Sequence, residues 1–167
     1  YSNNNLIDEA DKILHENLHK ESFKDIHLDN LIRDNKHEDI ISFTLSLEKD
    51  RYSIYGNRRM NKYSTARYEA YRKLSMKKEQ WDLALEIFMD GDFDYYHELR
   101  ALSSFGDVEF YAILISEFEK LKDYKSNISY LKLINRENDF ERILDYIKHN
   151  PYSIKEYAYK LYSIFPD

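Results

Sequence analysis

Apolar residues recur along this chain at intervals of three and four positions, which is the spacing of helices that bury one face. One such stripe predicts a helix near the start of the chain and contains Leu6, Ala10, Leu14 and Leu18. The same spacing predicts a short helix over residues 26–32. Another stripe runs from Ile41 through Tyr52 and Tyr55 to Gly56 and Asn57, a pair typical of a helix C-terminus.

After Gly56, helices are predicted to follow one another at a regular interval. Residues suited to a helix N-terminus recur every 14–17 positions ahead of an apolar stretch, at Ser75, Asp92, Asp107, Asp123, Asp139 and Ser153. Two such helices make a unit of about 31 to 32 residues, a length typical of helical-hairpin solenoids. The helix over residues 107–121 has apolar side chains around most of its circumference, so we expect it to be the most buried.

The scarcity of turn-forming residues predicts an all-α fold, because a sheet protein of this length needs many tight turns. The chain has 3 Gly and 2 Pro among 167 residues. We expect an α-solenoid, a right-handed array of antiparallel helical hairpins with about eight to ten helices. A single domain is expected over residues 1–167, with a hinge near residues 56–62 between an N-terminal helical part and a repeat array over residues 62–167.

The two-helix unit resembles tetratricopeptide repeats. Trp81, Ala84 and Phe88 fall at the places of the aromatic-then-small pattern of that repeat. The chain departs from the pattern at Leu85, where the repeat has Gly, and near Ser104, where the repeat closes its second helix with Pro. The resemblance implies a divergent relative or an analogue of the repeat.

A second resemblance is to the helical region of bacterial SWIM-type zinc-finger proteins. It covers roughly residues 68–165 and depends on residues 71–81 (YRKLSMKKEQW), on Gly91 to Phe93 and on the break at Asn150 and Pro151. The zinc module of that family needs Cys, and this chain has none. The resemblance therefore implies a helical partner segment whose zinc module lies elsewhere. Because the chain begins with Tyr1 rather than Met, we expect it to be a piece of a longer protein.

Composition excludes several classes of protein. The net charge of -6, from 31 acidic and 25 basic residues, argues against a chain that coats nucleic acid through its overall charge. No apolar run approaches the roughly 20 residues of a membrane span. The absence of Cys excludes disulfides and thiolate catalysis. We expect no cofactor, no membrane association and a cytoplasmic location.

One catalytic motif is present. His15, Glu16 and His19 form the pattern H-E-x-x-H, which on a continuous helix places both imidazoles on one face beside a glutamate. In a zincin metallopeptidase the two His bind zinc, and the Glu is the general base for the metal-bound water. Lys20 and Glu21 follow the second His where zincins have an apolar residue, and no third ligand is marked. Two surface histidines are therefore the favoured interpretation.

Residues 58–78 are strongly basic within this acidic chain and contain interleaved tyrosines. Arginines beside stacking aromatic rings suit single-stranded nucleic acid or a phosphorylated partner, whereas a solvated helix face is the alternative interpretation. Tyr95 and Arg100 give a second polar and aromatic surface, which suits an interface or half-buried packing. The candidate binding residues are Arg58, Arg59, Arg67, Tyr71, Arg72, Tyr95 and Arg100.

Three functions remain open from the sequence. The first is a non-catalytic helical-repeat scaffold that binds a protein or peptide partner. The alternative is an accessory module of a SWIM-type protein that binds nucleic acid through residues 58–78. The third is a zinc metallopeptidase that uses His15 and His19 as metal ligands.

Overall fold

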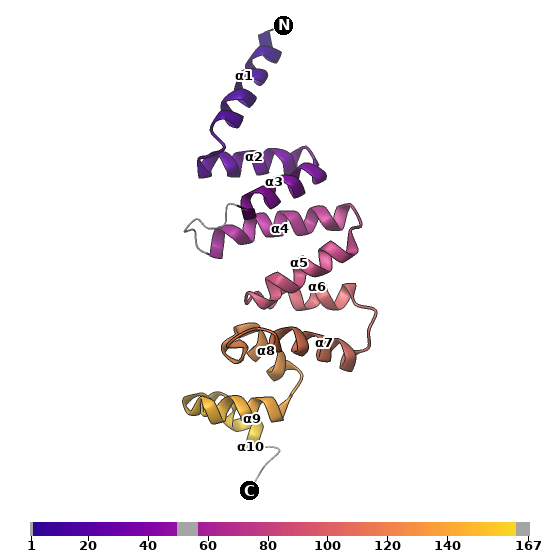
Figure 1. Cartoon of the computed structure of the whole chain (residues 1–167), viewed down its shortest axis with the longest axis vertical. Coiled ribbons are helices and arrows are strands. Elements are labelled where there is room, and N and C mark those ends of the chain that lie inside the picture. Colours follow the sequence, from indigo (N-terminus) through magenta and orange to yellow (C-terminus); the bar gives the residue numbers. More distant parts are fainter. Residues whose placement is uncertain (1, 50–56, 163–167) are drawn as a thin grey trace. The chain divides into compact units, whose positions relative to one another are not determined.

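All regular elements are helices in the computed structural model, which describes residues 2–49 and 57–162 (Figure 1). Their bounds are α1 Ser2–Glu16, α2 Glu21–Arg33, α3 His37–Lys49, α4 Asn57–Lys73, α5 Lys77–Met89, α6 Tyr95–Leu102, α7 Asp107–Glu119, η1 Tyr124–Ser126, α8 Ile128–Arg136, α9 Phe140–His149, η2 Pro151–Ser153 and α10 Ile154–Tyr162. The predicted all-α class is confirmed, since these residues form ten α-helices, two short 3₁₀ turns (η1 and η2) and no strand.

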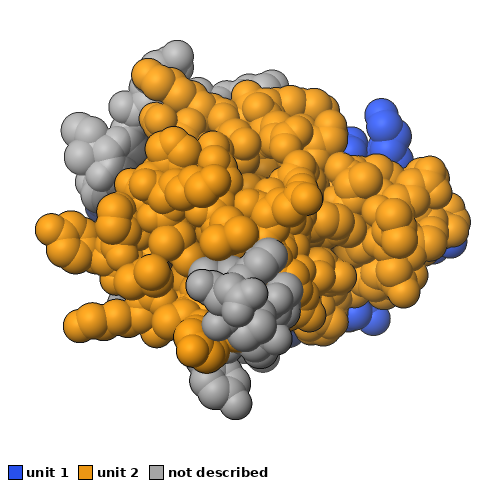
Figure 2. All heavy atoms as spheres, turned by 90° about the horizontal axis from the view of Figure 1, so that it is seen from below, with its two compact units in different colours: residues 1–83 blue, residues 84–167 orange. Residues whose placement is uncertain are grey.

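The chain divides into two compact units, Tyr1–Leu83 (unit 1) and Ala84–Asp167 (unit 2), coloured separately in Figure 2. The division falls within α5 and not near residues 56–62. Tyr52, Tyr55 and Gly56, which were expected to end a helix, lie outside the described residues. The hinge therefore stays a prediction.

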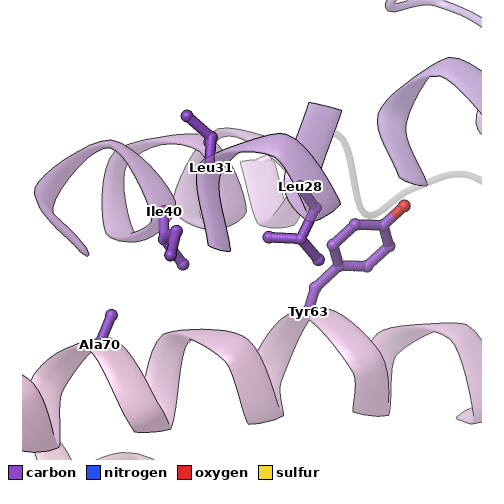
Figure 3. Close-up of a cluster of buried hydrophobic side chains, with 5 residues drawn as sticks. All are labelled: Leu28, Leu31, Ile40, Tyr63 and Ala70. Atoms are coloured by element: carbon purple, nitrogen blue, oxygen red, sulfur yellow. The ribbon is translucent and has the colours of Figure 1, made fainter. Parts of the chain in front are cut away.

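Unit 1 has an aliphatic core between α2, α3 and α4. Its buried side chains are Leu28, Leu31, Ile40, Tyr63 and Ala70 (Figure 3). Phe43 and Leu47 on α3 pack against this cluster and are partly buried. Burying a side chain as large as Leu contributes about 1.5–3 kcal/mol, so this cluster explains why α2, α3 and α4 associate.

Unit 2 has a core that is rich in aromatic rings. Its large apolar side chains that are fully buried include Phe88, Leu99, Phe110, Leu114, Phe118, Leu133, Ile134 and Ile143. The Phe118 ring lies edge-on to Phe88, at a centroid distance of 5.5 Å, and to Tyr130, at 5.6 Å. Val108 on α7 is 85% exposed and Leu121 is 42% exposed. The expectation that this helix is the most buried was therefore wrong, since α7 buries four of its 13 residues and α8 buries four of its 9.

Four of the turns between helices share one backbone geometry. Each contains a residue with positive φ: Asn35 (54°), Ser75 (57°), Gly91 (112°) and Asn138 (54°). The next residue donates its N–H to the carbonyl five positions back, at N···O distances of 2.9–3.3 Å. This is the Schellman arrangement, which satisfies the last carbonyls of a helix and reverses the chain. Ser75, which we predicted to start a helix, instead occupies this left-handed position.

Side-chain caps start two of the later helices. Asp139 accepts a hydrogen bond from the backbone N–H of Arg142 at 3.1 Å, so its predicted role as an N-cap is confirmed. Asn127 was not predicted, although it accepts from the N–H groups of Ser129 and Tyr130 at the start of α8. Its amide also donates to the carbonyl of Met89 at 2.6 Å, which ties the start of α8 to the end of α5.

Helices that are two apart in the chain are also in contact within each unit. In unit 1, Lys62 on α4 pairs with Asp29 on α2 at 3.1 Å. In unit 2, the hydroxyl of Tyr111 on α7 donates to Asp139 at the start of α9 at 2.6 Å. Tyr96 on α6 donates to Glu137 at the end of α8 at 3.0 Å. Each unit thus joins alternate helices by polar contacts, in addition to the packing of consecutive helices.

Candidate interaction surface

Most of the candidate residues from the basic segment lie on α4, where acidic residues of unit 1 neutralise several of its cations. The Lys62 ammonium lies 3.1 Å from Asp29 on α2. The Arg67 guanidinium donates to Glu48 on α3 at 2.5 Å, and Arg72 pairs with Glu69 on its own helix. Three cations of the basic segment therefore pair with acids inside unit 1, and the sequence did not reveal two of these pairs because Asp29 and Glu48 lie far away along the chain.

Arg67 and Tyr71 are buried, so their side chains offer little surface to a partner. Arg67 is 3% exposed, and its Nε and Nη1 groups have no hydrogen-bond partner. Tyr71 is 8% exposed. Burial raises the pKa of the Tyr71 phenol, and the neighbouring Arg67 charge partly opposes that rise. Both residues lie one helical turn apart on the packed side of α4.

Exposed lysines without an acidic partner lie at and beside the turn between α4 and α5, among the residues that the structure describes. Lys73, Lys77 and Lys78 are exposed and form no ion pair within the described part of the chain. Arg58 and Arg59 belong to the first turn of α4, and their side chains lie outside the described residues. Of the basic candidates of α4, the structure describes the side chains of Arg67, which is buried, and Arg72, which is exposed and paired with Glu69.

The H-E-x-x-H pattern does not lie on a continuous helix. Helix α1 ends at Glu16, where the Asn17 amide donates to the Ile13 carbonyl at 2.8 Å, and His19 follows in the turn. The His15 ring instead packs edge-on against His27 of α2, with a centroid distance of 5.3 Å. Within the described residues, no three His, Cys, Asp or Glu side chains gather as a metal ion would require.

In unit 2, the candidate Arg100 has a structural role at the turn between α6 and α7. Its Nη2 group lies 2.7 Å from Asp107, and its Nη1 group donates to the carbonyl of Phe105 at 3.1 Å. Its guanidinium also lies 5.3 Å from the centroid of the Phe110 ring. Tyr95 begins α6 and is half-buried. Arg100 therefore connects α6 to the start of α7.

A different group of side chains combines rings with exposed cations, and we call it the cation–ring face. It consists of Phe93, Tyr96, Lys132 and Arg136. The Phe93 and Tyr96 rings are stacked, with 5.4 Å between centroids and an interplanar angle of 6°. The Lys132 ammonium lies 5.7 Å from the Phe93 centroid, and the Arg136 guanidinium lies 4.6 Å from the Tyr96 centroid. Each cation is thus held over one ring of a stacked pair.

The two cations of this face differ in their access to acids. Arg136 lies 3.6 Å from Glu137, which also accepts a hydrogen bond from Tyr96. Burial and that hydrogen bond raise the pKa of the Tyr96 phenol, so it remains a neutral donor at physiological pH. Lys132 is exposed and forms no ion pair in the part of the chain that the structure describes. Lys132 therefore keeps its charge available to an external anion.

Spacing along the chain could have indicated part of this face. Ile128, Lys132 and Arg136 are four residues apart, so they share one face of α8, and all three are exposed. Phe93 and Tyr96 are three residues apart, which is compatible with two rings meeting near the start of a helix. The sequence could not show that these two groups meet, because their contact depends on the tertiary packing of α6 against α8.

None of the helices in the described residues combines the length and the apolar character that crossing a membrane requires. Comparison of the chain with protein-family models, with curated proteins and with solved structures finds no match.

Proposed function

We propose that this chain is a non-catalytic helical-repeat scaffold that binds a protein or peptide partner. The contacts between alternate helices support this proposal, because a solenoid stacks hairpins so that each helix touches its neighbours in its own layer. Lys62 with Asp29 is one such contact, and Tyr111 with Asp139 is another. The burial of Ala84 and Phe88 agrees with the resemblance to tetratricopeptide repeats, in which small and aromatic residues pack between helices.

The cation–ring face is the observation that supports partner binding most directly. It presents the half-buried Phe93 ring and Arg136, and the exposed Ile128 lies beside it on α8. Aromatic residues and Arg are enriched at protein interfaces. Such a surface can bind a peptide segment without any bond-making chemistry. We therefore place the partner site on α8 and on the turn before α6.

Selection of random peptides displayed on phage against the purified chain tests this function. We expect enriched peptides that bind in calorimetry and lose affinity in the variant Ile128→Ser. Val108→Ser is the matched control, since Val108 is also exposed but belongs to a different helix, α7. The proposal is wrong if no peptide is enriched, if both variants bind equally well, or if the purified chain turns over peptide or nucleotide substrates.

Binding of single-stranded nucleic acid is the second candidate function, and the three exposed lysines at the turn between α4 and α5 favour it. Changing Lys73, Lys77 and Lys78 together to Gln should abolish salt-dependent binding to single-stranded DNA if these residues contact phosphates. Arg67 is unsuitable for this test because it is buried against Glu48, so its replacement would alter folding. Absence of DNA binding at low salt would exclude this function for the chain.

A further inference from the structure

Lys132 differs from other exposed lysines of unit 2 in how it is held. Lys122 and Lys148 are exposed and also lack ion pairs within the described residues, but no ring lies under either ammonium in that part of the chain. Lys132 rests over Phe93, and Arg136 follows one helical turn later over Tyr96. A cation that is already positioned loses less side-chain entropy when it binds an anion. Lys132 and Arg136 should therefore lose less side-chain entropy on binding an anion than Lys122 and Lys148 would.

The chemistry of the face favours carboxylates over nucleobases. A base binds an aromatic residue by stacking on a free ring face. The Phe93 and Tyr96 rings stack on each other, and the two cations lie over them. Tyr96 is also 7% exposed. The face therefore offers charge and hydrogen-bond donors to a ligand, but little ring surface for a base.

The electrostatic surroundings favour a short acidic segment over a long polyanion. Residues 84–167 contain 10 basic and 16 acidic residues, so unit 2 repels a polyanion that extends beyond the face. At physiological ionic strength, exposed charges act over about 8 Å. Lys132 and Arg136 therefore act directly on a few ligand residues, opposed by Glu137, which lies 3.6 Å from Arg136. The net negative charge of unit 2 acts in addition on a longer anionic chain.

The spacing along α8 matches alternate residues of an extended peptide. Ile128, Lys132 and Arg136 follow one another at four residues, a rise of about 6 Å per step along a helix. In an extended segment, side chains on the same side recur every two residues, or about 6.6 Å. Two acidic residues separated by one position would thus reach Lys132 and Arg136. An apolar residue two positions further would reach Ile128, which is 61% exposed.

We propose that α8 binds an extended acidic peptide of the pattern acidic-x-acidic-x-apolar, with its carboxylates on Lys132 and Arg136 and its apolar side chain on Ile128. The pattern applies in either chain direction. This inference rests on the proposed peptide-binding function and specifies the class of peptide. The ligand contacts the helix face by charge-assisted hydrogen bonds and by apolar packing, and no covalent step is involved.

Fluorescence anisotropy with labelled peptides tests this inference. The probes are Asp-Ser-Asp-Ser-Leu, its reverse order, and Asn-Ser-Asn-Ser-Leu, each flanked by Gly-Ser. We expect an acidic probe to bind at least about tenfold more tightly than the Asn probe, with an affinity that falls as salt rises. The variant Lys132→Glu/Arg136→Glu should lose that binding and prefer a Lys-Ser-Lys-Ser-Leu probe.

Matched variants keep the result interpretable. Lys122→Glu/Lys148→Glu changes the net charge of unit 2 by the same amount and should retain binding, and Lys132→Glu alone serves if the double variant does not fold. The inference is overturned if acidic and Asn probes bind equally, if charge reversal leaves binding unchanged, or if oligothymidine binds this face more tightly. If phage-selected peptides bind through Ile128 but are not acidic, the inference fails while the proposed function stands. If no peptide binds at all, both fail.

Discussion

Unit 1 and unit 2 differ in net charge and in the surroundings of their unpaired cations. Residues 1–83 hold 15 basic and 15 acidic residues, and α4 pairs with acids on α2 and α3. Residues 84–167 have a net charge of -6, yet Lys132 stays on the surface without an acidic partner in the described residues. Among its described side chains, the most basic segment of the sequence has one buried arginine, Arg67, two cations paired with acids at the surface and three unpaired lysines, whereas the cation–ring face lies in the acidic half. The local pairing of a cation is more informative about binding than the charge of its segment.

The two units also differ in the kind of core that supports these charges. The core cluster of unit 1 is mainly aliphatic, with Leu28 and Ile40, and its ring contacts are a shorter series in which Phe43 meets His27 and Tyr63. Unit 2 is crossed by rings in contact, in the order Phe110, Tyr96, Phe93, Phe88, Phe118, Tyr130 and Tyr124. Two of these rings belong to the cation–ring face, so in unit 2 the core and the candidate surface are continuous.

The largest loss of stability is expected when a ring in the middle of that series is removed. Phe118→Ala should lower the free energy of unfolding by about 3–5 kcal/mol, because it leaves a cavity between Phe88 and Tyr130. Hydrogen exchange should show loss of protection in α7 and α8, while α2 and α3 keep theirs. Leu28→Ala is the counterpart in unit 1, where the loss should fall on α2 and α3. Equal loss in both units for either variant would mean that they unfold together.

The next largest loss of stability is expected from breaking the buried ion pair of unit 1, which tests whether that pair stabilises the unit. Glu48→Leu leaves the Arg67 guanidinium buried and unpaired, so we expect a loss of about 3 kcal/mol in urea denaturation. The double variant Glu48→Leu/Arg67→Met should recover most of the lost stability, because it leaves no buried charge. Glu69→Leu breaks only the exposed pair with Arg72 and should cost less than about 1 kcal/mol. A cost for Glu48→Leu as small as this control would contradict an essential role for the buried pair.

A pH titration tests the tyrosines of unit 2. Burial raises the pKa of Tyr130 to about 12, and burial together with the hydrogen bond to Asp139 raises that of Tyr111. Phenols of the unfolded chain ionise near pH 10. Their stabilising contribution is therefore complete below pH 10 and is lost as pH rises toward 12, because the unfolded state releases protons first. Tyr130→Phe should reduce this loss in urea denaturation at pH 8 and 11, whereas Tyr152→Phe, at an exposed position, should not.

The smallest change in stability is expected from a substitution in the turn between α4 and α5. Ser75 has a φ of 57°, a conformation that costs an L-residue about 1–2 kcal/mol and Gly almost nothing. After the greater backbone entropy of Gly in the unfolded chain is subtracted, Ser75→Gly should stabilise the protein by about 0.5–1 kcal/mol. Gly91→Ala, at a φ of 112°, should act in the opposite direction. Thermal unfolding of both variants checks this, and a destabilising Ser75→Gly would contradict the assigned turn geometry.

The sequence predicted the helical class well and the roles of individual residues less well. Apolar periodicity is local, so it indicated α7 with nearly correct ends, whereas the helix predicted over residues 26–32 begins at Glu21. Asp139 was identified as an N-cap. Asn127 was missed because half of its function is a bond to Met89, 38 residues away. Arg67 was assigned to a surface because its partner Glu48 lies on a different helix. Burial and pairing across helices depend on tertiary packing, which the sequence pattern does not contain.

The repeated turn has a consequence for how such a protein can change over evolutionary time. The four left-handed positions hold Asn, Ser, Gly and Asn, so the chain reversal requires a backbone angle and two main-chain bonds rather than one particular residue. Mutations can therefore replace the residues at these left-handed turn positions while the order of the helices is kept. Descendants of one ancestral helical chain could then share architecture long after their aligned identities have faded.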